Sequence, residues 1–422
     1  MIRFFNGKVL TCSGGLHVKE QEVWTDGDRI VYVGPGKTEA PTFDREVNLD
    51  GDILIPGFKD AHTHSAMTFL RSYADDLPLQ SWLFDKVFPL EERLNPQRVY
   101  WLTKLAILEY LSSGITASFD MYFHRPEYAK ANAECGFRTV ICCAVSGDAI
   151  DEGLVREEYK SLNAFDPLVS YKLGFHAEYT TSLSAMRQLS RLSHELYAPV
   201  WAHNSETKQE VEECIGRYGI TPTALMDREG LLDYGGGGYH CVWFSDEDIE
   251  IFRRRSAWAV TNPASNAKLA SGIAPLTRMM ERGVNLAIGT DGPASNNALD
   301  MFREMYLACV LQKLRNEDAA ACDADKILEI AVRGGALAMG LTNCDDIFPG
   351  KQADLVVIDL KRPNMQPVLN VTKNLVYSGS KENVRMTMVA GKILYENGAF
   401  SVGEDPERIY ARCAEIVREM TA

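Results

Sequence analysis

The middle of the chain alternates short apolar runs with longer helical stretches, and this alternation constrains the fold more than any other feature. Two of the helical stretches are QRVYWLTKLAILEYLSS (97–113) and LSAMRQLSRLSHELY (183–197). Near-continuous apolar strands joined by helices are typical of a parallel sheet buried on both faces. Eight such strands, with no G-x-G-x-x-G motif after the first, favour an α/β fold with a closed (β/α)8 TIM-type barrel over a doubly wound sheet. The predicted strands are 53–62, 115–120, 138–145, 169–177, 199–206, 238–242, 258–263 and 284–292.

Both ends of the chain have a different sequence pattern, in which short strand-like runs are separated by residues typical of turns. Asp26-Gly27-Asp28 is one such turn, and near the other end the runs are ADLVVIDL and VRMTMVAGKILYENGAF. We expect the two β segments to pair into one small domain outside the barrel, which would bring the two ends of the chain together. The predicted boundaries are 1–55 for the first β segment, 56–345 for the barrel, and 346–422 for the second β segment with a C-terminal helix.

Charge and composition exclude several classes of partner. The 44 basic and 58 acidic residues give a formal charge of −14, which disfavours binding to nucleic-acid phosphates and favours a small-molecule partner. No run approaches the ~18 apolar residues of a membrane span. The ten cysteines form no C-x-x-C pair and the N-terminus has no signal-peptide pattern, so we expect a cytoplasmic protein with reduced thiols. Assembly into a homo-oligomer is compatible with the sequence.

Residues able to bind a metal follow several of the predicted strands. The first strand ends in His62-Thr63-His64, the fifth in His203 with Glu206 three residues on, the sixth in His240, and the eighth in Asp291. A single His-x-His is more often incidental than a ligand pair. The functional residues of a barrel of this type, however, lie at the carboxyl ends of its strands. The sequence therefore predicts one site that combines all of these side chains.

The residue types at this site indicate the metal. In an extended strand, residues i and i+2 point to the same face, so His62 and His64 can bind one ion together. His203 and Asp291 would complete a nitrogen-rich set with one carboxylate, which suits a single divalent Zn²⁺, or Fe²⁺ as the alternative, better than Mg²⁺ or Ca²⁺. The remaining position is left for water, whose pKa falls from about 16 toward ~7 on such an ion.

Three further roles follow from this chemistry. Hydrolysis of an amine on a heteroaromatic ring needs a group that protonates the ring nitrogen and carries a proton to the leaving ammonia. Glu206 is the candidate proton carrier, and His240 is expected beside the metal, where it would orient the water. Asp291 is expected both to bind the metal and to accept a proton.

Several stretches of the sequence resemble the amidohydrolase superfamily, and within it the branch of 5-methylthioadenosine/S-adenosylhomocysteine deaminases and related chlorohydrolases. The resemblance extends over nearly the whole chain. It rests on PGFKDAHTHSAM, DLPLQSWLFDKVFPLEERL, DMYFH, HNSE, GYHC, NPASNAKLASGIAP, GTDGPASNN and GKQADLVVIDL.

The resemblance implies specific roles and a specific architecture. It implies a β-sandwich built from the two chain ends, and catalytic roles for Glu206 and His240. It also implies that Glu91, in PLEERL, binds ribose hydroxyls, although a solvated helix face is the simpler explanation of that charged run. The metal ligands it implies are His62, His64, His203 and Asp291.

The chain also departs from the pattern of that branch, in the part expected to bind substrate. The stretch GFHAEYTTS places either Glu178 or His176 where the branch has a strand-4 histidine. Cys143 stands where an arginine for the homocysteine carboxylate is expected, and Arg156 is the candidate for a second such arginine. These departures put S-adenosylhomocysteine in doubt as a substrate. Trp82 is a candidate lid residue that would cover a purine.

Three functions are compatible with the sequence. The first is a metal-dependent hydrolytic deaminase of an amino-substituted N-heterocycle, such as an adenosine-type nucleoside or a related purine. The second is a chlorohydrolase-like or other amidohydrolase that acts on a triazine, pterin, guanine or cyclic amide. The third, from another class, is a catalytically silent metal-binding barrel.

Overall fold

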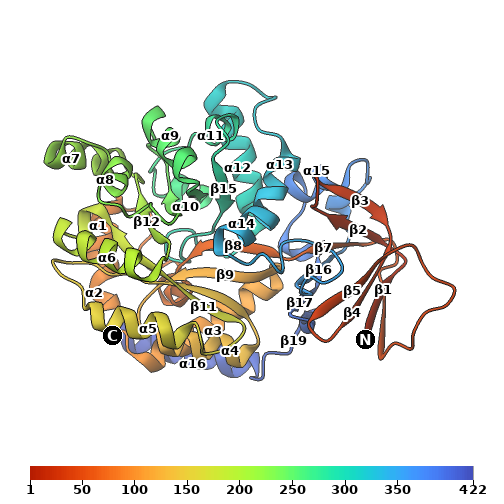
Figure 1. The fold of residues 1–422 in the computed structure, drawn as a ribbon. Helices are drawn as coiled ribbons and strands as arrows, with labels where there is room; N and C mark the ends of the chain where they lie inside the picture. Colours follow the sequence, from red (N-terminus) through yellow and green to blue (C-terminus); the bar gives the residue numbers. More distant parts are fainter. Residues whose placement is uncertain (422) are drawn as a thin grey trace.

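The computed structural model describes residues 1–421, apart from the side chain of Leu79, and its centre is an eight-stranded parallel barrel (Figure 1). The strands follow one another around the barrel in chain order, from β8 to β15, each parallel to the next. They are β8 (Phe58–Thr63), β9 (Ile115–Met121), β10 (Arg138–Cys142), β11 (Val169–Ala177), β12 (Val200–Asn204), β13 (Gly236–His240), β14 (Trp258–Thr261) and β15 (Asn285–Ile288). The predicted (β/α)8 barrel is confirmed.

Helices cover the outside of the barrel and line its mouth (Figure 1). A 3₁₀ segment, Ser65–Leu70, follows β8, and a π-helical segment, Leu83–Val87, joins α1 to α2. The helices are α1 (Leu79–Trp82), α2 (Phe88–Glu91), α3 (Pro96–Ser112), α4 (Arg125–Cys135), α5 (Glu152–Leu162), α6 (Leu183–Leu196), α7 (Lys208–Tyr218), α8 (Pro222–Arg228), α9 (Asp246–Arg255), α10 (Pro263–Lys268), α11 (Leu276–Glu281), α12 (Met301–Asn316), α13 (Ala324–Glu329), α14 (Gly335–Met339), α15 (Val371–Tyr377) and α16 (Pro406–Thr421).

The first predicted strand, 53–62, is two strands that belong to different sheets. β7 (Ile53–Pro56) lies in the terminal β-sandwich, and β8 begins the barrel. The chain passes between them at Gly57, where a Cβ atom would lie 2.1 Å from Cγ2 of Thr116. Both strands are fully buried, although β8 contains Lys59, Asp60 and His62 where β7 is apolar throughout, so burial continues across the change of sheet.

Hydrogen bonds between the ends of β8 and β15 close the barrel. The backbone N–H of Asp291 donates to the carbonyl oxygen of His62 at 2.9 Å. Thr290 donates to the buried carboxylate of Asp60 through its N–H at 2.8 Å and its hydroxyl at 2.6 Å. Closure therefore brings Asp291 beside the histidines of β8.

The two chain ends form a β-sandwich of two sheets beside the barrel (Figure 1). In the larger sheet, β7 pairs with β2 on one side and with β16 on the other, so N-terminal and C-terminal segments share it. The side chains of Phe4, Val23, Leu54, Val357 and Met388 contribute to the core between the sheets. The smaller sheet contains β5 (Arg29–Gly34), β4 (Glu22–Asp26), β1 (Ile2–Phe5) and β6 (Arg45–Asn48), and the larger β19 (Ala399–Phe400), β18 (Lys392–Glu396), β17 (Val384–Val389), β16 (Leu355–Ile358), β7, β2 (Lys8–Thr11) and β3 (His17–Glu20).

The C-terminal helix differs from expectation in its position. The sequence grouped α16 with the second β segment, but α16 packs on the barrel helix α3, where the Cys413 thiol donates to the carbonyl oxygen of Trp101 at 3.3 Å. Figure 1 shows the N-terminus in the sandwich and the end of α16 under the barrel, on the opposite side of the molecule. The β segments of the two ends meet, but the two termini themselves do not.

A buried charge cluster joins the sandwich to the bottom of the barrel. Asp354, next to β16, receives two hydrogen bonds from Arg138 of β10, both at 2.9 Å, and lies 3.6 Å from Nζ of Lys59 on β8. The carboxylate and the lysine side chain are fully buried. Although burial alone would raise it, the charges of Arg138 and Lys59 hold the pKa of Asp354 at about 2.

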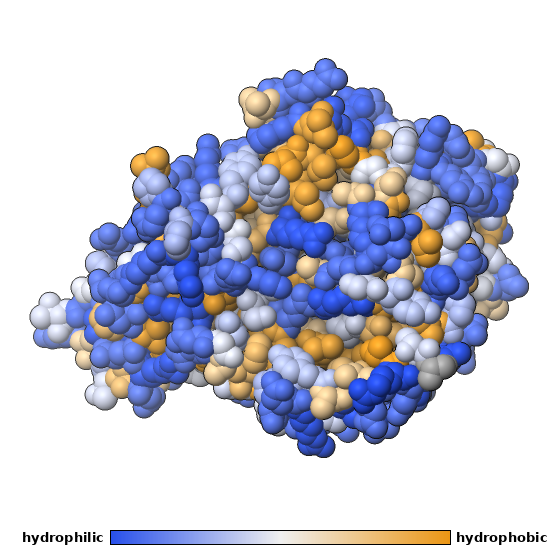
Figure 2. Space-filling model, turned by 180° about the vertical axis from the view of Figure 1, so that it is seen from behind, coloured by the Kyte–Doolittle hydropathy of each residue, from blue (hydrophilic) through white to orange (hydrophobic). Residues whose placement is uncertain are grey.

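The face of the molecule shown in Figure 2 is mostly hydrophilic, with scattered apolar patches. Within residues 1–421, no helix is both long and apolar enough to cross a membrane. All ten cysteines are buried free thiols, in agreement with the sequence analysis.

Candidate metal centre and substrate pocket

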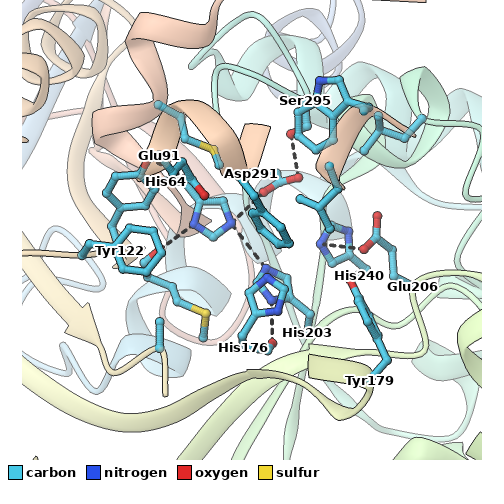
Figure 3. Close-up of a pocket in the computed structure, with 18 residues that line it drawn as sticks. His64, Glu91, Tyr122, His176, Tyr179, His203, Glu206, His240, Asp291 and Ser295 are labelled. Atoms are coloured by element: carbon cyan, nitrogen blue, oxygen red, sulfur yellow. Dashed lines mark hydrogen bonds and ion pairs between the residues drawn. The ribbon is translucent and has the colours of Figure 1, made fainter. Parts of the chain in front are cut away.

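Side chains from the carboxyl ends of four barrel strands converge on one buried centre (Figure 3). One ligand atom from each of four residues lies within 4.8 Å of the others. His64 also faces this centre, because its Nε2 lies 3.3 Å from Nε2 of His203 and 3.2 Å from Oδ1 of Asp291. The four mutually close residues are His62, His203, His240 and Asp291. His240, expected only beside the metal, is thus as close to the centre as the predicted ligands.

The histidines are oriented by acceptors on their Nδ1 atoms. Nδ1 of His64 lies 2.6 Å from the Met121 carbonyl oxygen, and Nδ1 of His203 lies 2.7 Å from that of His176. A carbonyl oxygen can only accept, so each ring donates from Nδ1 and turns its Nε2 toward the centre. Such partners on the outer nitrogen are typical of metal-binding histidines.

The Nδ1 atom of His240 also has an acceptor, which in this case belongs to a side chain. Its Nδ1 lies 2.8 Å from Oδ1 of the buried Asn266, which precedes the end of α10. Its Nε2 points toward the centre and lies 4.0 Å from Oε2 of Glu206. Asn266 therefore fixes both the tautomer and the direction of the His240 ring.

The ring nitrogens of His62 differ from those of the other histidines at the centre. Both ring nitrogens are fully buried and have no hydrogen-bond partner, and Nε2 lies 3.5 Å from Oδ1 of Asp291. Burial lowers the pKa of His62 to about 3, so the ring is neutral. Leaving a buried polar atom unpaired costs roughly 1–3 kcal/mol. A cation between the neutral imidazole and the carboxylate would supply the missing interaction, so the residues present fit a divalent metal ion.

The two carboxylate oxygens of Asp291 have different partners. Oδ2 accepts hydrogen bonds from the hydroxyls of Ser265 at 2.6 Å and Ser295 at 2.7 Å, while Oδ1 faces His62 and His64. Figure 3 shows Asp291 with Ser295 and His64. Burial alone would raise the pKa of Asp291, but its contacts with the histidines hold it well below the ordinary value. The carboxylate is therefore charged and offers one oxygen to a cation.

Glu206 lies at the floor of the pocket, next to His240. Its carboxyl group is buried and accepts a hydrogen bond from the Ser271 hydroxyl at 3.2 Å. The backbone N–H groups of Ser205 and Glu206 donate to the carboxylate of Glu210 at 2.9 and 2.8 Å, which fixes the turn before α7. The contacts with Glu210 at the start of α7 therefore fix the position of Glu206.

The centre opens into a pocket of about 700 Å³, counting its open mouth. Aromatic and apolar side chains form most of the wall, and Trp82 belongs to it as a buried residue. Glu91 also lines the pocket, and the Tyr122 hydroxyl donates to its Oε1 at 2.7 Å. Burial raises the pKa of Glu91 to about 7. The lining residues are His64, Met67, Trp82, Leu83, Phe88, Glu91, Met121, Tyr122, Phe123, Ala144, His176, Tyr179, His203, Glu206, His240, Leu269, Asp291 and Ser295.

The part of the sequence that forms the barrel matches a known protein family. The model of the amidohydrolase family matches residues 53–394, which include the whole barrel. The chain belongs to the amidohydrolase family.

Individual relatives of this amidohydrolase match over nearly its full length. A 5-methylthioadenosine/S-adenosylhomocysteine deaminase of Syntrophomonas wolfei is 37% identical, over 93% of this chain and 92% of the relative. A 5'-deoxyadenosine deaminase of Methanopyrus kandleri is 36% identical, over 98% and 99%. The crystal structure of an adenosine deaminase from Xanthomonas campestris with bound zinc superimposes with a TM-score of 0.94 at 33% identity, covering 100% of this chain and 98% of that one.

Two substrate-binding candidates of this amidohydrolase lie away from the pocket. The Glu178 carboxylate pairs with Arg217 of α7 at 2.6 Å, and Arg156 on α5 pairs with Glu195 of α6 at 2.8 Å. β11 ends at Ala177, so the alternation that points His176 into the pocket stops before Glu178, which turns toward α7. The expectation of substrate contacts for Glu178 and Arg156 is therefore corrected, and His176 takes the pocket position.

Sequence reasoning missed several supporting residues of the site. Ser265 and Asn266 lie in NPASNAKLASGIAP, and Ser295 lies in GTDGPASNN, two stretches used only for the family resemblance. Tyr122 and Tyr179 also line the pocket. Small polar residues just after a strand end were the available signal. Ser265 and Asn266 contact Asp291 and His240 from a different strand end, whereas Ser295 lies four residues after its partner Asp291.

Proposed function

We propose that the chain is a hydrolytic deaminase that releases ammonia from an adenosine-type nucleoside. The observation that carries the proposal is the buried convergence of His62, His203, His240 and Asp291, with Glu206 beside them, at the floor of a pocket large enough for a nucleoside. The names of the relatives, which are deaminases of adenosine compounds, support the same reaction class.

The proposed cofactor is a single divalent ion, with Zn²⁺ as the first candidate and Fe²⁺ as the second. His62, His64, His203 and Asp291 would hold it, as three neutral imidazoles and one carboxylate suit either metal. When bound, such an ion makes a water molecule acidic enough to act as a nucleophile near neutral pH. The unpaired nitrogens of His62 support this assignment independently of activity.

The remaining site residues supply orientation and proton transfer. His240, fixed by Asn266, directs Nε2 to the reacting centre and orients the attacking water. Glu206 carries one proton of the attacking water to the ring nitrogen of the substrate and the other to the departing amine, and ammonia leaves as the C–N bond breaks. Asp291 holds its free oxygen where it can also accept a proton from the attacking water.

The pocket wall would bind the rest of a nucleoside. Trp82 and Phe88, on opposite sides of the Leu83–Val87 segment, are placed to cover a flat base. Glu91 is placed to accept hydrogen bonds from ribose hydroxyls, and Tyr122 holds its carboxyl group. The pocket therefore combines one apolar surface with a few convergent polar groups, as small-molecule sites usually do.

Ammonia release tests the proposal directly. The purified protein is assayed with adenosine, 5-methylthioadenosine, guanine, cytosine, a pterin and an aminotriazine, and chloride release is followed with a chlorinated triazine. We expect ammonia from the adenosines. Turnover of only the triazine, pterin or guanine would favour the other amidohydrolase reactions, and no turnover combined with no metal in elemental analysis would favour a silent barrel.

A variant of a proposed ligand separates the site from the rest of the fold. Asp291→Asn is expected to fold but to lose several orders of magnitude in kcat and to bind less metal, because the only carboxylate of the set is removed. Ammonia release and elemental analysis measure both effects. A variant that keeps the wild-type rate would contradict the assignment.

A further inference from the structure

We propose that the pocket selects adenosine compounds whose 5′ substituent is uncharged, and that it discriminates against S-adenosylhomocysteine. The inference rests on the proposed function and deepens it. The relatives' names include compounds of both kinds, since 5-methylthioadenosine and 5'-deoxyadenosine have apolar 5′ ends and S-adenosylhomocysteine ends in an ammonium and a carboxylate. The two kinds therefore make different demands on the same pocket.

The charged groups of the pocket wall do not suit a carboxylate. Within the described part of the chain, residues 1–421, no lysine or arginine lines the pocket. The acidic side chains that line it are Glu91, Glu206 and Asp291. A carboxylate taken from water into such surroundings loses its hydration and gains no cationic partner, which is strongly unfavourable.

Two cationic side chains that lie close in sequence to the wall, Arg125 and Lys268, are paired elsewhere. Arg125, two residues after the lining residue Phe123, donates to the Glu158 carboxylate at 2.8 Å. Lys268, next to the lining residue Leu269, pairs with Asp75 at 2.5 Å. Arg125 or Lys268 would have to leave its present partner before it could bind a substrate carboxylate.

The wall instead offers apolar surface. Leu83 and Phe88 belong to the segment over the pocket, and Met121, Phe123 and Ala144 lie at or just after the ends of β9 and β10. Met121 is buried, and Ala144 leaves space because its side chain is small. A methyl or thioether group buried against such surface gains free energy in proportion to the apolar area removed from water.

A matched set of substrates tests the inference. Values of kcat/KM are compared for 5'-methylthioadenosine, 5'-butylthioadenosine and S-adenosylhomocysteine, because the butyl chain reaches as far as the homocysteine carboxyl carbon and carries no charge. We expect the two thioethers to agree within about tenfold and S-adenosylhomocysteine to be lower by about 100-fold or more, as for a buried charge left unpaired.

The other outcomes have distinct meanings. Similar values for S-adenosylhomocysteine and the butyl compound would overturn the inference, whether both are good substrates or both are poor, since charge would then not decide. Failure of every adenosine compound, adenosine included, would instead overturn the proposed function.

A pair of variants locates the 5′ end in the pocket. Ala144→Arg adds a cation to the wall, and Ala144→Gln adds a side chain of similar reach without charge. We expect the ratio of kcat/KM for S-adenosylhomocysteine to that for 5'-methylthioadenosine to rise at least tenfold in the arginine variant only. An unchanged ratio in the folded, zinc-loaded arginine variant would contradict the assignment of this wall to the 5′ group.

Discussion

At the scale of single residues, the candidate site depends on side chains that hold other side chains. His64 and His203 are oriented by backbone carbonyl oxygens, which substitution cannot remove. His240 depends on the carboxamide of Asn266, and Glu91 depends on the hydroxyl of Tyr122. The last two contacts can therefore be removed one at a time without touching a proposed ligand.

Asn266→Ala is expected to lower kcat by about 10- to 100-fold, the usual cost of losing a partner on the outer nitrogen of a site histidine. The His240 Nδ1 proton would be buried without an acceptor, and the ring would lose its fixed direction. Metal content should stay close to wild type, because His62, His64, His203 and Asp291 remain. Assays of ammonia release and of metal content measure these two effects. An unchanged kcat would show that His240 does not need the hydrogen bond to Asn266.

Tyr122→Phe is expected to raise KM for ribonucleosides by roughly 3- to 10-fold with a smaller change in kcat, since about 1 kcal/mol of hydrogen bonding that positions Glu91 is lost. The matched control is a 2',3'-dideoxynucleoside, which has no diol for Glu91 to bind and should show little change. An equal effect on both substrates would mean that Tyr122 acts on the fold of the pocket and not through Glu91.

At the scale of elements, the junction between β7 and β8 decides whether one continuous buried segment can join the sandwich to the barrel. Gly57 lies against Thr116 of β9, whose hydroxyl also accepts a hydrogen bond from Lys59 at 2.6 Å. Any side chain at this position must displace the strand or the threonine. The glycine is required by close approach and not by a turn.

Gly57→Ala is therefore expected to lower the free energy of unfolding by about 1–3 kcal/mol, the usual cost of overpacking. Gly216 is the matched control, because it lies within α7 and a Cβ there would meet nothing within 4 Å. Gly216→Ala should be neutral or stabilising by up to about 1 kcal/mol from helix propensity. Chemical denaturation of both variants measures the difference, and equal stabilities would contradict the packing argument.

At the scale of the whole molecule, Asp354, Arg138 and Lys59 connect the sandwich to the barrel through buried charge. Removing one partner of such a group leaves the others charged and unpaired in the interior. Since the pKa of Asp354 is held below its ordinary value, its contribution is fully present above pH 4 and is lost as the pH falls through about 2.

Asp354→Asn is expected to destabilise the protein by about 3–5 kcal/mol at neutral pH. The gap in Tm between wild type and variant should narrow as the pH falls below 4, because the Asp354 carboxylate of the unfolded wild-type chain then begins to take up a proton while the folded one stays charged. Thermal unfolding followed across pH 2.5 to 7 measures this. A gap that stays constant with pH would show that the charge of Asp354 contributes nothing.

The sequence by itself determined the eight-stranded barrel, the β-sandwich from both ends and the positions of His62, His64, His203, His240 and Asp291 at strand ends. These depend on local patterns, since apolar runs and the residues that follow them are read along one strand at a time. Only the tertiary structure decided what depends on neighbouring strands. Closure of β15 onto β8 placed Asp291 beside His62, and the supports Ser265 and Asn266 came from α10, which follows a different strand. The end of β11 at Ala177 pointed His176 inward and sent Glu178 to Arg217, because the alternation of a strand holds only while the strand continues.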